Sequence, residues 1–125
     1  MFTLKHNVAL YVPSTIGVDT AIDNMQIVLS VATQMAGKFG GAHLESQTST
    51  GFYIANDGKL VAESTKVLRA FVDDVSIAME FMINLARELC VELTQESVLV
   101  VVDGEAFFVD LSLIHISEPT RLLSI

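Results

Sequence analysis

The first segment of the chain alternates between apolar and polar positions with a period of two. Val8, Leu10 and Val12 fall on one side, whereas Asn7 and Tyr11 fall on the other. Alternation of this kind is typical of a β-strand with one buried face. The pattern predicts a strand over residues 2–12 that ends at Pro13. It places His6 on the apolar side, where we expect a core histidine bonded to the backbone.

Two longer stretches repeat apolar residues every three or four positions, as amphipathic helices do. The first helix is predicted to begin after a cap at Ser14 or Thr15 and to end at the glycines of residues 37–41. The second is predicted to begin at Asp73 or Asp74, or shortly after them. Each helix therefore has one broad apolar stripe to bury.

The remaining segments are short alternating runs separated by turn signals. Between residues 42 and 74 these runs are interrupted by Asn56-Asp57-Gly58, and near the end two apolar runs flank Asp103-Gly104. Asn, Asp and Gly tolerate positive φ, which tight hairpins require. Both sequences therefore predict β-hairpins.

The order of these elements is strand, helix, strands, helix, strand, strand. Each helix can act as a right-handed crossover between parallel strands of one sheet. We therefore expect an α+β fold, a ferredoxin-like βαββαβ sandwich with an extra C-terminal strand. Both helices should lie on one face of an antiparallel or mixed sheet.

The end of the chain does not continue these patterns. From Leu111 it reads LSLIHISEPTRLLSI, which resembles a translated sequencing-adaptor read-through. We therefore expect a single α+β domain at residues 1–111 and a non-native tail at residues 112–125, which is set aside from functional argument. A genuine short C-terminal extension is the alternative.

Composition narrows the class of protein. The 125 residues are 51% hydrophobic and carry seven Lys and Arg against fifteen Asp and Glu, a net charge of −8. An acidic chain is disfavoured as a partner of nucleic acids or anionic membranes. No apolar run is long enough to span a bilayer, and the single Cys90 cannot form an internal disulfide. We expect a cytoplasmic protein.

One face of the expected sheet is left without helices. Alternation places Arg69 on this open face beside the apolar Val67 and Phe71, where an unpaired charge is costly. We expect Arg69 to lie near Asn7 or Ala9 and to pair with Glu45. The open face is predicted to be a homodimer interface or a pocket for a small polar or anionic molecule, and the two are compatible.

Polar and aromatic residues of this face and its edges are the candidate ligand-binding residues. Arg69 would meet an anionic or carbonyl group, the tyrosines would stack, and the others would orient the ligand. The set comprises Asn7, Tyr11, His43, Glu45, Gln47, Tyr53 and Arg69. His43 and Glu45 alone are too few for a structural zinc site, so no metal, cofactor or catalytic residue is predicted.

Several short motifs resemble an uncharacterised family of small bacterial and phage α+β proteins. They are Glu63-Ser64-Thr65-Lys66-Val67-Leu68 and Gln95-Glu96-Ser97-Val98-Leu99, within a similarity over about residues 40 to 102. The resemblance implies the fold and a cytoplasmic setting, and no activity. From the residues themselves we expect an ion pair between Glu63 and Lys66 at a strand end. Gln95 and Glu96 would cap the second helix or fix the turn after it.

Three functions follow as hypotheses. The first is a non-catalytic homo-oligomer that binds or sequesters a small ligand, such as a phage sponge for a nucleotide signal. The second is an acidic module that inhibits a partner by occupying its basic site. The third is a small enzyme that uses His43 and Glu45 as acid and base.

Overall fold

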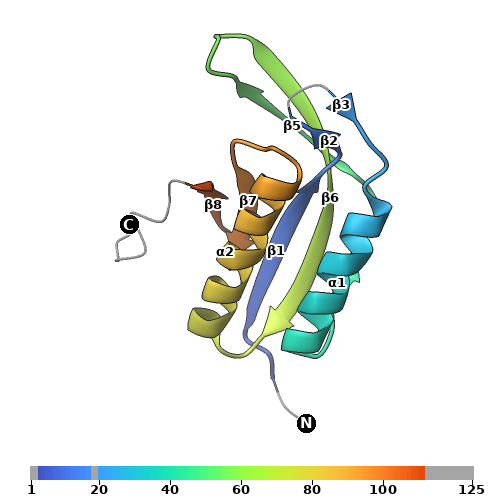
Figure 1. The fold of residues 1–125 in the computed structure, drawn as a ribbon. Coiled ribbons are helices and arrows are strands. Elements are labelled where there is room, and N and C mark those ends of the chain that lie inside the picture. Colours follow the sequence, from blue (N-terminus) through green and yellow to red (C-terminus); the bar gives the residue numbers. More distant parts are fainter. Residues whose placement is uncertain (1–2, 18–19, 112–125) are drawn as a thin grey trace.

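The computed structural model describes residues 3–17 and 20–111. A central sheet, two helices and a small separate hairpin make up the fold (Figure 1). In chain order the elements are β1 (His6–Pro13), β2 (Thr15–Ile16), β3 (Thr20–Ala21), α1 (Met25–Phe39), β4 (His43–Leu44), β5 (Ser49–Ile54), β6 (Leu60–Val72), α2 (Val75–Glu92), β7 (Val98–Val102) and β8 (Glu105–Val109).

The main sheet has the strand order β4-β6-β1-β7-β8, and β5 also pairs with β6. The paired strands are antiparallel. Both helices cover the same face of this sheet, and within the described residues its other face has no helix on it (Figure 1). The prediction of an α+β fold with two helices on one side of a sheet is confirmed.

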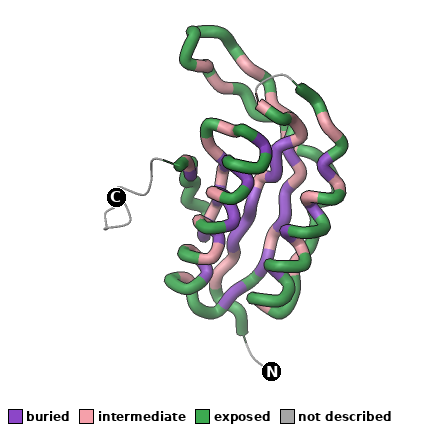
Figure 2. Tube along the Cα trace, in the orientation of Figure 1, coloured by how far each residue is buried: buried purple, intermediate pink, exposed green. Residues whose placement is uncertain are grey.

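The core lies between the helices and the sheet. On the central strand, Leu10 pairs with Leu68 of β6 and with Val100 of β7, and all three side chains are almost fully buried. Met35 of α1 and Met82 of α2 are buried with them in the same cluster. Figure 2 shows the buried positions concentrated along the middle strands and the inner sides of the helices.

The predicted turns are confirmed. Residues 55–59 join β5 to β6, Gly58 has φ +85°, and Asp103-Gly104 joins β7 to β8. The second helix begins where it was expected, because the Asp74 side chain accepts a hydrogen bond from the backbone N–H of Ile77. The first helix ends before Gly40, which adopts the left-handed conformation.

The predicted start of the first helix is wrong. The chain after Pro13 forms the hairpin of β2 and β3, and α1 begins only at Met25. A capping hydroxyl must accept from a backbone N–H, but the Ser14 hydroxyl donates to the carbonyl of Ser64. Ser14 is thereby tied to β6. Residues 18 and 19 of the expected first turn lie outside the described residues.

A fully buried asparagine takes over the junction between β1 and α1. The Asn24 side chain donates to the carbonyls of Pro13 at 2.8 Å and Val12 at 3.3 Å. Its oxygen accepts from the Lys66 ammonium at 2.8 Å. Asn24 thus hydrogen-bonds to polar groups of β1 and β6 at the N-terminal end of α1.

Replacing Asn24 with Ala is expected to lower the free energy of unfolding by about 2 kcal/mol, because buried acceptors lose their donor. Urea unfolding measures this loss. Ser30→Ala, on the exposed side of α1, is the control and should change stability by less than about 0.5 kcal/mol. Equal effects of the two substitutions would show that the Asn24 contacts contribute nothing.

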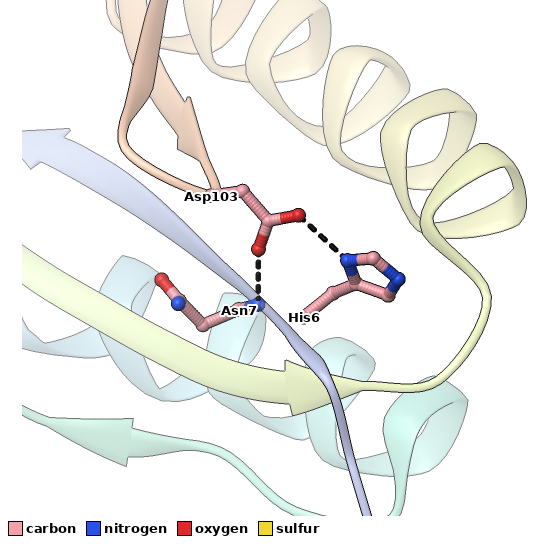
Figure 3. A network of polar contacts seen from close by, with 3 residues as sticks. All are labelled: His6, Asn7 and Asp103. Atoms are coloured by element: carbon pink, nitrogen blue, oxygen red, sulfur yellow. Dashed lines mark hydrogen bonds and ion pairs between the residues drawn. The ribbon is translucent and has the colours of Figure 1, made fainter.

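The prediction for His6 is also wrong. Its Nδ1 lies 2.6 Å from Asp103 Oδ2, and a third of its side chain is exposed (Figure 3). Strand β7 pairs with β1 only as far as Val8, so His6 lies beside the β7–β8 turn and not in the core. The backbone N–H of Asn7 donates to Asp103 Oδ1 at 2.9 Å. This bond, with that of His6, lowers the pKa of Asp103.

Among the described residues, no helix has the length and apolar character required to cross a membrane.

Candidate functional site

The open face of the sheet contains a cavity of about 300 Å³, which we call the hairpin pocket. Its floor is formed by β1 and β6, one wall by β5, and the other wall by β7, β8 and the loop after α2. It is lined by Tyr11, Pro13, Ser49, Gly51, Phe52, Tyr53, Glu63, Thr65, Gln95, Glu96, Ser97, Val98, Leu99 and Phe108.

Strand register brings these side chains to one face. Gly51 of β5 is directly opposite Glu63 of β6, and Pro13 of β1 is opposite Thr65. Paired residues point to the same side of a sheet, as do residues two apart on one strand. A Cβ at Gly51 would meet nothing within 4 Å. The missing side chain therefore leaves open space beside the Glu63 carboxylate.

The pocket combines aromatic rings with negative charge. Burial raises the pKa of Glu63, which is half-buried in the pocket lining. Burial also raises the pKa of Tyr53, and the charges of Glu63 and Glu96 raise it further. The carboxylates of Glu63 and Glu96 thus both disfavour ionisation of the Tyr53 phenol, which lines the cavity. This arrangement suits an organic cation with a flat, apolar part.

Gln95 fixes the rim of the pocket next to α2. Its side-chain amide donates to the carbonyls of Thr15 at 3.0 Å and Gly17 at 2.9 Å. Its backbone N–H donates to the backbone carbonyl of Cys90, near the end of α2. Gln95 therefore fixes the turn after the second helix, one of the roles expected for it, and also holds the β2 segment against it.

The structure separates the predicted ligand-binding residues into three places. Tyr11 and Tyr53 line the hairpin pocket. Gln47 is exposed in the loop between β4 and β5. The other four residues, Asn7, His43, Glu45 and Arg69, gather at the β4 side of the open face and do not line this pocket.

The expectations for Arg69 are confirmed. It is opposite Ala9, its Nη1 donates to Asn7 Oδ1 at 3.3 Å, and its Nε donates to Glu45 Oε2 at 3.3 Å. The guanidinium is therefore already paired. His43 is exposed and stacks on the ring of Phe71, with 6.0 Å between ring centroids. His43 and Glu45 are both exposed, and neither lines the hairpin pocket.

The expected ion pair between Glu63 and Lys66 is wrong. Residues three apart on a strand point to opposite faces. Glu63 accordingly faces the pocket, whereas the Lys66 ammonium reaches Asn24 on the helix side. Glu63 and Glu96 were expected to have structural roles only. The period-two pattern places Glu63 on the same face as Arg69, and that signal could have identified it.

Within residues 3–17 and 20–111, no three His, Cys, Asp or Glu side chains gather as metal ligands would.

No family model matches the chain, and no curated protein matches it in sequence. Two solved structures are similar in fold. One is a phage SAM lyase in complex with S-methyl-5′-thioadenosine, with a TM-score of 0.67 and 15% identity, covering 86% of this chain and 90% of that chain. The other is a phage SAM lyase in the apo state, with a TM-score of 0.61 and 18% identity, covering 88% and 94%.

These comparisons establish that the chain shares the fold of phage SAM lyase. They contradict the prediction of a non-catalytic protein, because both neighbours are enzymes. The binding of a small molecule by a neighbour agrees with the coarser prediction of a small-ligand site. The acidic inhibitor module stays a prediction.

Proposed function

We propose that this protein is a SAM lyase that binds SAM in the hairpin pocket and releases S-methyl-5′-thioadenosine. The observation that carries the proposal is the half-buried Glu63 carboxylate among aromatic side chains, in a cavity of a fold shared with phage SAM lyase. An unpaired carboxylate facing an apolar cavity favours a cationic ligand.

The chemistry of SAM fits the lining of the pocket. SAM joins a flat adenine ring to a sulfonium cation. Tyr11, Tyr53 and Phe108 supply aromatic surface for the ring. Glu63 and Glu96 supply negative charge for the sulfonium. The adenine ring and the sulfonium of SAM therefore each have a counterpart among the lining residues.

Release of the thioether from SAM breaks one carbon–sulfur bond. The electron pair of that bond goes to sulfur, which changes from a sulfonium cation to a neutral thioether. The four-carbon fragment completes its bonding through an oxygen of its own carboxylate or by losing a proton. The positive charge on sulfur falls along this reaction, so the apolar part of the pocket lining favours it.

The pocket carboxylates then act mainly on binding. A carboxylate beside the sulfonium stabilises bound SAM more than the bound neutral product. SAM is thereby retained and S-methyl-5′-thioadenosine is released. Gln95 and the Thr15 segment hold the rim in place while the ligand changes charge.

Incubation of the purified chain with SAM, followed by chromatography and mass spectrometry, tests the proposal. We expect S-methyl-5′-thioadenosine to accumulate in proportion to enzyme concentration. Glu45→Gln, which removes a carboxylate from the same face outside the pocket, should leave the rate within about twofold. Absence of the thioether product at every SAM concentration would refute the proposal.

A second copy of the chain is proposed to cover part of the open face. Phe71 is 50% exposed there, and Val101 of β7, opposite Ala9, adds apolar surface on the same face. Exposed apolar surface of this kind is typical of an interface, and symmetric dimers are the commonest solution. The dimer would shield Phe71 from water.

Phe71→Glu is expected to convert the dimer to a monomer, because a buried unpaired carboxylate opposes association. Sedimentation equilibrium should give twice the mass of one chain for the natural sequence and the mass of one chain for the variant. Ile77→Glu is the matched control, since Ile77 is also 50% exposed but lies on α2. A monomeric natural chain, or loss of the dimer in both variants, would contradict this assignment.

We also propose that the core is ferredoxin-like, supported by a strand order in which β6 and β7 flank β1. A cytoplasmic location is part of the same proposal. It is supported by Cys90, which is a free, buried thiol.

A further inference from the structure

The hairpin of β5 and β6 extends past the other strands of the sheet (Figure 1). Asn56, in the turn at its end, donates its side-chain N–H to Glu96 Oε2 at 3.3 Å. Glu96 belongs to the loop between α2 and β7 and lines the hairpin pocket. The Asn56–Glu96 contact therefore joins the two walls of the cavity, 40 residues apart in sequence.

The outer part of this hairpin has little packing to hold it in place. Its strands pair with each other, with Ile54 opposite Leu60. Phe52, Ile54 and Leu60 are each about two-thirds exposed. Segments with few buried contacts open at low free-energy cost. A single hydrogen bond between the tip and the opposite wall can therefore shift the position of the hairpin.

The same contact orients a carboxylate of the pocket. Glu96 is exposed to solvent, yet its charge acts on Tyr53 in the cavity wall. An exposed glutamate samples many rotamers, and a hydrogen bond restricts them. Asn56 thus holds the Glu96 carboxylate beside the cavity while it brings the hairpin across.

We propose that the β5–β6 hairpin is a closing arm over the pocket and that the Asn56–Glu96 hydrogen bond is its latch, which positions Glu96 and slows ligand release. The identity of the ligand rests on the function proposed above, whereas the latch itself does not. Asn56 and Glu96 are positioning residues in this account.

An exchange of the two side chains separates the latch from any general effect of substitution. Asn56→Asp sets two carboxylates against each other and breaks the bond. Adding Glu96→Gln to it restores a hydrogen bond, with the amide now on the loop, and returns the net charge to that of the natural chain. Lys59→Gln in the same hairpin changes the net charge by the same amount as Asn56→Asp but leaves the latch intact.

Stopped-flow dissociation of S-methyl-5′-thioadenosine is the first measurement. Asn56→Asp should release it at least about fivefold faster, since loss of one charge-assisted hydrogen bond is worth roughly that factor or more. The exchanged pair should release it more slowly than Asn56→Asp alone, and Lys59→Gln should stay within about twofold of the natural chain. Release by Asn56→Asp at the natural rate would overturn the proposal.

Amide hydrogen exchange of residues 50–63 in the free protein is the second measurement, and it needs no ligand. Asn56→Asp should speed exchange in this segment and the exchanged pair should restore it. If S-methyl-5′-thioadenosine binds no variant, the proposed function fails while this exchange still decides whether the latch exists. Exchange unaffected by Asn56→Asp, or faster exchange with unaltered release, would contradict a latch that controls the ligand.

Discussion

Glu63→Gln should weaken the binding of SAM by about ten- to thirtyfold while the affinity for S-methyl-5′-thioadenosine changes by less than about twofold. Charges about 4 Å apart near a protein surface attract by roughly 4 kcal/mol, and partial exposure reduces that figure to about half or less. Only SAM carries the sulfonium, so the substitution removes this attraction from SAM and not from S-methyl-5′-thioadenosine. Isothermal titration with each ligand measures both affinities.

Glu45→Gln is the control for this result, because Glu45 is paired with Arg69 on the same face but outside the pocket. Its affinity for SAM should be unchanged. If Glu63→Gln weakened both ligands equally, Glu63 would be acting on the shape of the pocket and not on charge.

The same glutamate predicts a dependence of SAM binding on pH. Burial raises the pKa of Glu63 above its ordinary value of 4.5. Its attraction for a cation is present above this raised pKa and is lost as pH falls through it. SAM affinity should therefore fall on acidification before ordinary carboxylates titrate, and in Glu63→Gln that part of the pH dependence should disappear.

The largest effect on stability is expected at Leu10, in the centre of the sheet. Leu10→Ala should lower the free energy of unfolding by about 3 kcal/mol, through lost burial and a cavity that its neighbours cannot fill. Leu10 is completely buried between Leu68 and Val100. Urea unfolding at equilibrium measures the loss from the change in midpoint at constant slope.

Leu29→Ala provides the matched control, since it makes the same chemical change on α1 where the side chain is 53% exposed. Its cost should stay below about 1 kcal/mol. A comparable loss at the two positions would mean that the described core does not carry the stability of the fold.

Local signals in the sequence were sufficient for most of the fold. The turns at Asp103-Gly104 and Asn56-Asp57-Gly58 contain positions with positive φ, which Asp103, Gly104 and Gly58 adopt. The residue types that tolerate this conformation can be recognised without knowing the rest of the molecule. The stripe of α2 and its Asp74 cap act within a few residues. The start of α1 was predicted wrongly because it depends on a distant contact. Ser14 hydrogen-bonds to Ser64, 50 positions away, and no local pattern reveals this.

The site was predicted only in part for the same reason. Alternation placed Tyr11 and Arg69 on the open face correctly. The pocket occupies only part of that face, and of these two residues Tyr11 lines it and Arg69 does not. The pocket depends on Gly51 being opposite Glu63 and on Glu96 approaching from the loop after α2. Strand register and loop position are properties of the assembled sheet, so Glu63 and Glu96 were assigned structural roles from sequence.

A crystal structure of the full chain grown with S-methyl-5′-thioadenosine tests the central assignment most directly. We predict density in the hairpin pocket, with the adenine against Tyr11 or Tyr53 and the sulfur on the side of Glu63. Density beside Arg69 and Glu45, with the hairpin pocket empty, would contradict the assignment.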